Sequence, residues 1–261
     1  MKSILETIIE QKRREVIRLK SEFTIKDFEK SAYFHLPCIS MTEKLAKSQF
    51  GIIAEMKRKS PSAGVINRSF IPAELAGIYE QKGAVGISVL TDYHFFGGAI
   101  SDLLEVKKNT VLPVLRKDFI IDEIQILEAK SIGADVLLLI AEALTEQEIL
   151  HFTILAQELG MEVICEFHEK QQLNKINEFV DIIGVNNRNL KLQTTDLQTS
   201  IEVIDFLPKN KLIISESGIK TIQELEMLES IGYNGALIGE SILKSESLGV
   251  FENRLLLTQL K

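Results

Sequence analysis

Eight short apolar runs recur along the chain from residue 51 onward, and their starts lie 20 to 33 residues apart. Each run is nearly continuous in Ile, Leu and Val, which is typical of parallel strands covered on both faces. The stretches between the runs are long enough for a helix and two loops, so the pattern indicates a repeated strand–helix unit. The expected strands are Gly51–Lys57, Ala84–Leu90, Leu112–Asp118, Val136–Ile140, Glu162–Phe167, Ile182–Asn186, Leu212–Ser215 and Gly235–Ile238.

The segments between these runs carry helix-end signals. Ile71-Pro72-Ala73-Glu74 predicts a helix start, because proline is favoured in the first turn. Helix stops are expected at four glycines, Gly83, Gly133, Gly160 and Gly232. Eight units without a Gly-x-Gly-x-x-Gly fingerprint after the first run favour a closed (β/α)8 TIM barrel, with a doubly wound sheet as the alternative fold.

No Pro- or Ser-rich linker divides the chain, so the sequence predicts a single barrel domain over residues 1–261. About residues 1–48 precede the first unit and are expected to form an N-terminal helical extension. Helical spacing of apolar residues predicts an amphipathic helix from Met1 to about Lys20. We expect it to pack over the barrel; a role on a membrane surface is the alternative.

Composition narrows the class of protein. The net charge of −7 argues against a nucleic-acid partner but leaves room for a small anionic substrate. Two cysteines and four scattered histidines give no disulfide framework and no metal-ligand spacing, so no bound metal is expected. No apolar run approaches the roughly 18 residues that span a bilayer. Charged residues interrupt the first segment where a signal peptide would need an apolar stretch, so the expected location is the cytoplasm.

Charged and amide side chains stand at the ends of five of the expected strands. A charge inside a barrel costs free energy unless it is paired or functional. Barrel enzymes build their active sites at the carboxyl ends of the strands. A network of ion pairs at the rim is the structural alternative, but five ends that meet at one mouth favour an active site. These residues are Glu55, Lys57, Lys117, Glu166, Asn186, Arg188, Glu216 and Ser217.

Two small-residue turns follow the seventh and eighth strands, at Ser217-Gly218 and Gly239-Glu240-Ser241. Loops at these positions often bind phosphate, because their backbone N–H groups lie next to a helix start. Ordinary turns are the alternative interpretation. With Lys57 as a balancing cation, the turns predict a phosphate-ester substrate, and the remaining carboxylates and lysines are left for acid–base chemistry.

Six segments in register along the barrel carry a shared pattern: Ile53–Ser62, Ile87–Asp92 with Phe95–Gly97, Pro113–Phe119, Gly184–Leu190, Ser215–Ile219 and Leu237–Ser241. Together they resemble the indole-3-glycerol phosphate synthases; one such segment would be weak evidence, but six in order are highly specific. The resemblance implies conversion of 1-(2-carboxyphenylamino)-1-deoxyribulose 5-phosphate to indole-3-glycerol phosphate in tryptophan synthesis, with loss of carbon dioxide and water. Gly97-Gly98 and Ala63 differ from the family pattern, which affects loop motion rather than the assignment.

The resemblance also implies residue roles. Lys117 looks like the general acid at the sugar carbonyl, and Glu166 like its partner for later proton transfer. The implied catalytic residues are Lys117, Glu166, Glu55, Lys57, Asn186, Glu216 and Ser217. The implied substrate-binding residues are Ser60, Phe96, Phe119, Leu138, Arg188, Gly218, Leu237, Gly239 and Glu240. Among these, Lys57, Gly218 and Gly239 would bind the phosphate, Arg188 would meet the anthranilate carboxylate, and Phe96, Phe119 and Leu138 would wall the aromatic ring.

Lys117 is also favoured by its position, because it shares a strand face with Leu115 and should reach into the mouth. We expect Glu55 and Glu166 to keep its ammonium charged. We also expect the nearby cations Lys57 and Arg116 to lower its pKa from the usual value of about 10.4, which would make it a better acid.

The implied substrate carries its own electron sink, since its nitrogen can hold positive charge as an iminium; no organic cofactor is therefore expected.

Two alternative functions are considered. One is that of another phosphate-binding barrel enzyme, such as phosphoribosylanthranilate isomerase. Its Cys/Asp pair has no counterpart here, because Cys165 adjoins Glu166 and should point away from the mouth. The other alternative is a non-catalytic barrel that binds an anionic metabolite or a protein. The resemblance also allows weak association with other enzymes of the tryptophan pathway.

Overall fold

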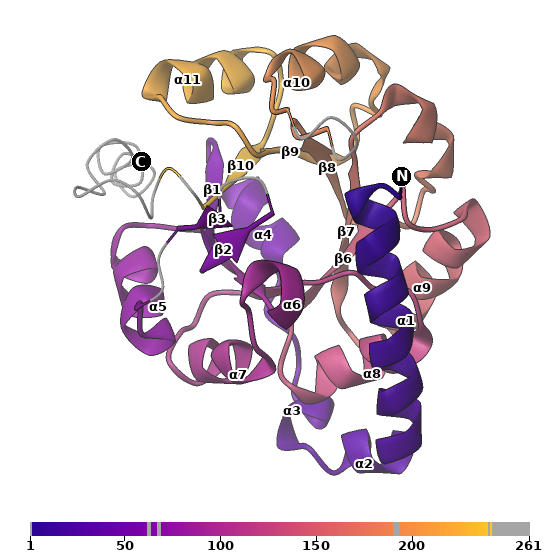
Figure 1. Cartoon of the computed structure of the whole chain (residues 1–261). Coiled ribbons are helices and arrows are strands. Elements are labelled where there is room, and N and C mark those ends of the chain that lie inside the picture. The colour runs from indigo at the N-terminus through magenta and orange to yellow at the C-terminus, as the bar shows by residue number, and fades with distance from the viewer. Residues whose placement is uncertain (1, 62–63, 67–68, 190–193, 240, 242–261) are drawn as a thin grey trace.

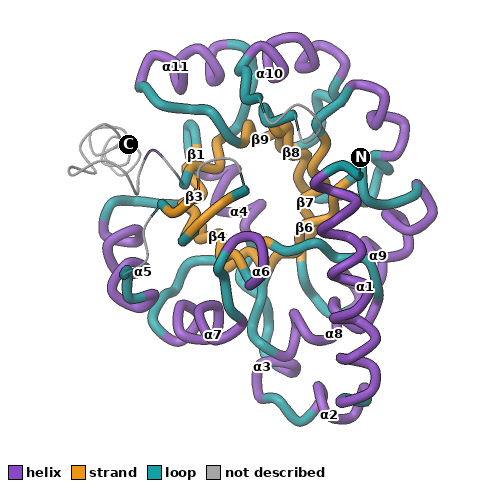
Figure 2. The backbone as a smooth tube through the Cα atoms, in the orientation of Figure 1, coloured by secondary structure: helices purple, strands orange, loops and turns teal. Residues whose placement is uncertain are grey.

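A computed structural model describes residues 2–61, 64–66, 69–189, 194–239 and 241. Its central feature is a closed barrel of eight parallel strands in the order β1-β10-β9-β8-β7-β6-β5-β4 (Figure 1). Figure 2 shows the ring of strands with helices around it, which confirms the predicted (β/α)8 architecture. The strands are β1 (Gly51–Met56), β4 (Gly86–Leu90), β5 (Val114–Lys117), β6 (Val136–Ile140), β7 (Glu162–Phe167), β8 (Ile182–Asn186), β9 (Leu212–Glu216) and β10 (Gly235–Ile238).

The predicted strands agree with these bounds in place and order, and β6, β7, β8 and β10 agree at both ends. The predictions for β4 and β5 began two residues early, those for β1 and β5 ended one residue late, and that for β9 ended one residue early. Pro113 has no N–H with which to extend the ladder, so regular pairing begins at Val114.

Helices surround the barrel between the strands. They are α5 (Pro72–Gln81), α6 (Tyr93–Phe96), α7 (Ile100–Lys108), α8 (Glu123–Ser131), α9 (Glu146–Glu158), α10 (Gln198–Val203) and α11 (Ile222–Ser230). The four glycines predicted to stop helices follow α5, α8, α9 and α11, and each has a positive φ, as a helix-terminating glycine should. Between β7 and β8 the connection holds the 3-10 helix η1 (Lys170–Lys175) in place of the expected α-helix, and η2 (Ile204–Phe206) follows α10. A small antiparallel hairpin, β2 (Lys59–Ser60) with β3 (Gly64–Val65), rises from the loop after β1.

Alternation along the strands produces two apolar layers. Side chains such as Ile53 and Leu115 point into the barrel, whereas Ile52 and Cys165 belong to the layer between the strands and the outer helices. The amino end of the barrel is closed by α4 (Met41–Lys47), whose Met41 and Leu45 are buried in the interior layer. The barrel interior is therefore packed, and only its carboxyl end is available for a site.

The N-terminal extension predicted over about residues 1–48 contains four helices, α1 (Ile4–Glu22), α2 (Ile25–Glu29), α3 (Ala32–His35) and α4. Helix α1 begins with a capping box between Ser3 and Glu6. It runs along one side of the barrel next to α8 in Figure 1, and its Ile8 is buried in the interior layer. Among the described residues no helix is long and apolar enough to cross a membrane.

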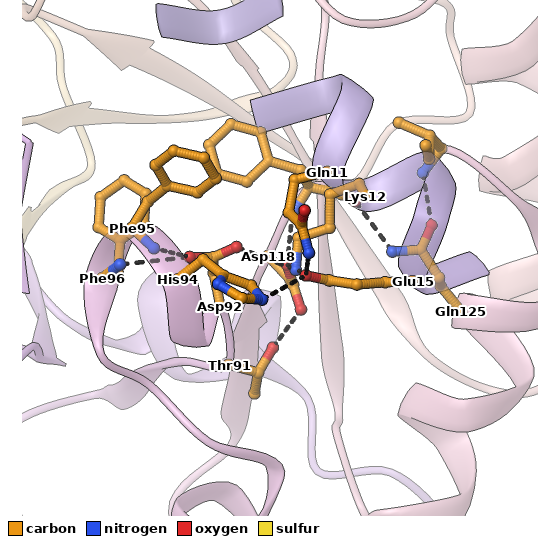
Figure 3. Close-up of polar contacts among 12 residues, drawn as sticks. Gln11, Lys12, Glu15, Thr91, Asp92, His94, Phe95, Phe96, Asp118 and Gln125 are labelled. Atoms are coloured by element: carbon orange, nitrogen blue, oxygen red, sulfur yellow. Dashed lines mark hydrogen bonds and ion pairs between the residues drawn. The ribbon is translucent and has the colours of Figure 1, made fainter. Parts of the chain in front are cut away.

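A buried ion network attaches α1 to the barrel (Figure 3). Lys12 is 3% exposed, and its Nζ lies 2.8 Å from Asp118 Oδ1 and 3.1 Å from Asp92 Oδ2. Burial alone would lower the pKa of Lys12, but these two aspartates raise it above its usual value, so the ammonium stays charged. Asp92 also accepts hydrogen bonds from the backbone N–H groups of Phe95 and Phe96, which starts α6. Lys12 thus links α1 to the ends of β4 and β5.

Candidate active site

A pocket opens at the carboxyl ends of the strands beneath α1. Every predicted site residue that the structure describes lines it: Glu55, Lys57, Ser60, Phe96, Lys117, Phe119, Leu138, Glu166, Asn186, Arg188, Glu216, Ser217, Gly218, Leu237 and Gly239. Glu240, also predicted, lies outside the described residues. The structure therefore brings together side chains that the sequence places on separate barrel units.

The sequence prediction missed several lining residues, of which Ile4 and Ile8 of α1 matter most. Their spacing of four residues identified an apolar helix face. It gave no indication that this face would form the roof of the pocket. Asp118 and Ile140 also line the pocket and were not predicted as site residues.

Four charged side chains occupy one layer of the barrel mouth. Glu55, Lys117, Glu166 and Glu216 come from the first, third, fifth and seventh strands of the barrel, and alternate strands of such a barrel contribute to a common layer. Lys117 Nζ lies 2.9 Å from Glu166 Oε2 and also contacts the Glu216 carboxylate. One lysine is thus held between two carboxylates inside the mouth.

The pKa of Lys117 is raised, so the expectation that neighbouring cations lower it is wrong. Burial alone would lower this pKa, but Glu166, Glu216 and Glu55 outweigh burial by stabilising the ammonium. Arg116 does not oppose them, because strand alternation turns its guanidinium to the outer face, where it lies 2.7 Å from Glu128 Oε2. The positive charge of Lys57 is also compensated by a carboxylate, because its Nζ lies 2.5 Å from Glu55 Oε1.

The two carboxylates on Lys117 have pKa values shifted in opposite directions. Burial would raise the pKa of Glu166, but Lys117 and His168 lower it below its usual value. The pKa of Glu216 is raised by burial and by the charge of Glu166, which together outweigh Lys117. Glu216 Oε1 lies close to the bare backbone of Gly184, where an added Cβ would come within 2.4 Å. An ionised and a more readily protonated carboxyl side by side form an acid–base pair.

The turns after β9 and β10 form a second region of the pocket. Ser217 and Gly218 have φ values of 67° and 80°, a left-handed conformation that is rare for a residue such as serine. The Oγ of Ser241 donates a hydrogen bond to the carbonyl of Ile219 at 2.6 Å, so the two turns are tied together. Gly239 has no room for a side chain, because a Cβ there would lie 2.7 Å from Glu55 Oε1. Backbone is therefore accessible to a ligand on this side of the mouth.

An aromatic wall forms the opposite region. The rings of Phe96 and Phe119 have centroids 6.0 Å apart, and Leu138 and Ile8 line the pocket beside them. Asn186 is held beside Glu166, because its Nδ2 donates a hydrogen bond to Glu166 Oε1 at 3.0 Å. Its Oδ1 accepts a hydrogen bond from the backbone N–H of Arg188 at 3.0 Å. The mouth thus has an apolar slot, a charged centre and a turn-lined end.

Fold and site together define a (β/α)8-barrel enzyme with acid–base groups at the carboxyl ends of its strands. A profile described as indole-3-glycerol phosphate synthase matches residues 5–255. Relatives with that name are 41% identical in Bacteroides thetaiotaomicron (95% of this chain, 96% of the relative), and 43% identical in Chloroherpeton thalassium (95% and 97%). A relative from Legionella pneumophila is 42% identical (95% and 96%). The chain belongs to the indole-3-glycerol phosphate synthase family, whose members are decarboxylating, ring-closing carboxy-lyases of tryptophan biosynthesis.

A solved structure supports the fold alone. N-acetylmannosamine-6-phosphate 2-epimerase from Clostridium perfringens matches with a TM-score of 0.58 and 15% identity, covering 80% of this chain and 93% of the epimerase. At that identity the likeness carries no information on substrate.

Proposed function

We propose that the barrel mouth performs the family's reaction with the residues that the sequence singled out. The substrate would be 1-(2-carboxyphenylamino)-1-deoxyribulose 5-phosphate and the product indole-3-glycerol phosphate. The observation that carries this assignment of roles is Lys117 held between Glu166 and Glu216, because ring closure and dehydration need an acid and a base in one cavity.

Binding uses the two ends of the mouth. The phosphate sits at the Ser217–Gly218 and Gly239 turns with Lys57 as its cation, and the anthranilate ring enters the slot beside Phe96 and Phe119. Arg188 meets the anthranilate carboxylate, and Glu55 and Asn186 hold the sugar hydroxyls. This orientation places the sugar ketone at the charged centre.

Lys117 then protonates the ketone oxygen while the ring carbon that bears the carboxylate attacks the ketone carbon. The new carbon–carbon bond leaves positive charge on the nitrogen as an iminium, and the breaking bond to carbon dioxide returns its electron pair to the ring. Glu216, whose pKa is raised by burial, can resupply a proton to Lys117. The new hydroxyl leaves as water with a proton from Lys117, which Glu216 has reprotonated, and Glu166 accepts the ring proton, which restores aromaticity.

The structure argues against the isomerase alternative. Cys165 is fully buried in the outer layer, as predicted, and burial raises the pKa of its thiol to about 12. It is therefore an inert side chain of the packed core. A barrel that only binds an anion has no need of four buried charged groups in one layer, which are costly to bury.

An activity assay tests the proposal. The purified protein should convert 1-(2-carboxyphenylamino)-1-deoxyribulose 5-phosphate to a product with indole fluorescence. It should leave phosphoribosylanthranilate unchanged. Turnover of phosphoribosylanthranilate would favour the isomerase, and binding of both compounds without turnover would favour a non-catalytic barrel.

Gly239→Val should weaken phosphate binding, because the new side chain would meet Glu55 and hold the anion away from the backbone. Loss of charge-assisted hydrogen bonds worth about 1.5–3 kcal/mol corresponds to a rise in KM of roughly tenfold or more. Competitive inhibition by inorganic phosphate should weaken in parallel. Gly77→Val is the matched control, since Gly77 faces open space on α5. An unchanged phosphate inhibition constant in Gly239→Val would place the phosphate elsewhere.

We further propose that the chain functions as one domain in the cytoplasm without a nucleic-acid partner, in line with its net charge of −7.

We propose that the reaction uses no metal ion. The residues that the structure describes contain no cluster of three or more His, Cys, Asp or Glu side chains suited to a metal. Activity should therefore be unaffected by EDTA; loss of activity that a divalent ion restores would contradict this.

A further inference from the structure

His168 lies just beyond the end of β7 and is 7% exposed. Its Nδ1 lies 2.8 Å from Glu142 Oε2, in the turn that follows β6. The other oxygen of Glu142 accepts from the backbone N–H of His168 at 2.7 Å and of Glu169 at 3.2 Å. Glu142 therefore fixes both the position and the orientation of the imidazole ring.

The second ring nitrogen faces the active site. His168 Nε2 lies 3.4 Å from Glu166 Oε1, and it is buried without a hydrogen-bond partner among the described residues. A neutral ring that donates from Nδ1 to Glu142 would turn a bare nitrogen lone pair toward a carboxylate oxygen. A protonated ring removes that repulsion and places a positive charge 3.4 Å from Glu166 Oε1.

Charged groups on five elements lie around His168. Glu142, Glu166 and Glu216 face it from the β6–α9 turn, β7 and β9, and Lys117 of β5 lies beyond the two carboxylates of the mouth. Lys175 of η1 donates to the carbonyls of Ala141 and Leu144, so its charge lies on the same turn as Glu142. Burial would lower the pKa of His168, but the three carboxylates raise it above its usual value.

We propose that His168, held by Glu142, is a positioning residue that keeps Glu166 ionised for its role as the base of the reaction. The inference rests on the role of Glu166 given under the proposed function. Lys117 also stabilises the Glu166 carboxylate, but it loses its positive charge each time it gives a proton to the substrate. The imidazolium of His168 is not spent in that step. It therefore maintains the low proton affinity of Glu166 while Lys117 is neutral.

Histidine NMR tests the pairing directly, because the chain has only four histidines. The Cε1–Hε1 signals are titrated, and His168→Gln assigns the signal of His168. We expect His168 to titrate above the usual value of about 6.5, and to titrate lower by about one unit in both Glu166→Gln and Glu142→Gln. His151 pairs with Glu123 at the surface at 2.7 Å and is the internal reference that should not move. A His168 that titrates at its usual value, or that is unaffected by Glu166→Gln, would overturn the inference.

The pH dependence of kcat/KM tests the consequence. Removing the imidazolium raises the proton affinity of Glu166, so the acid limb in His168→Gln should move to higher pH by about one unit. His151→Gln should leave the acid limb in place.

Glu166→Gln separates the inference about His168 from the proposed function. Near-normal activity in that variant would contradict the proposed role of Glu166 itself. An inactive Glu166→Gln with an unmoved limb in His168→Gln would overturn only the inference about His168. If His168→Gln does not fold, the titration of His168 in Glu142→Gln and Glu166→Gln decides.

Discussion

Lys117→Ala should lower kcat by about 10²- to 10⁴-fold, the usual contribution of a positioned general acid. KM should change little, because the contacts proposed for the phosphate and the anthranilate carboxylate do not involve Lys117. The variant also leaves Glu166 and Glu216 adjacent without their shared cation, so the pKa of Glu166 should rise. Steady-state kinetics across a pH series measure both effects.

Lys117→Arg is the matched control for charge. Arginine keeps a cation near the two carboxylates, but its guanidinium is not deprotonated in proteins, and its rigid fork cannot take the place of the compact ammonium of Lys117. We therefore expect kcat to stay low in Lys117→Arg although the protein remains folded. Near-normal kcat with a raised KM in Lys117→Ala would show that Lys117 is a binding group. Lys57 would then be the next candidate for the acid.

Lys12→Met should destabilise the protein by about 3–5 kcal/mol, the usual cost of removing one partner from a buried ion pair. Asp92 and Asp118, which are 0% and 3% exposed, would lose their cation from α1. Asp118 would keep Arg116, whereas the remaining contacts of the Asp92 carboxylate with described residues would be its hydrogen bonds from the backbone of α6. Urea denaturation measures the change in the free energy of unfolding.

Lys20→Met is the control on the same helix. Lys20 also joins α1 to the barrel, through Asp122 at 2.6 Å, but it is 53% exposed and such pairs contribute little. Equal stability of the two variants would show that Lys12 does not anchor the helix. A double variant, Lys12→Met with Asp92→Asn, should recover part of the lost stability because it removes the carboxylate charge that has lost its cation. The buried network thus gives α1 a part in the stability of the fold.

Local patterns were sufficient to predict the strands and most of the site. Alternation along a strand placed Glu55 and Lys57 on the inward face with Ile53, and Lys117 with Leu115, and all of these positions are confirmed. The same alternation predicted that Cys165 points outward while its neighbour Glu166 lines the mouth. Such inferences need only neighbouring residues and the known location of barrel active sites.

Contacts between distant segments were not predictable in the same way. Nothing local to Lys12 indicated a buried cation, because its partners Asp92 and Asp118 lie on other barrel units. The pKa of Lys117 was predicted in the wrong direction, since its sequence neighbour Arg116 was counted and the distant Glu216 was not. The layer rule for barrels, applied to the odd-numbered strands, would have joined Glu216 to Lys117.

The crystal structure of the protein with bound indole-3-glycerol phosphate tests the arrangement of the site most directly. We predict the phosphate between Lys57 and the turns at Gly218 and Gly239, and the indole ring against Phe119 beneath Ile8 of α1. Lys117 Nζ should then lie next to the indole carbon that was the ketone carbon of the substrate, beside Glu166 and Glu216. A phosphate bound away from both turns, or a product whose indole ring lies far from Lys117, would contradict the account.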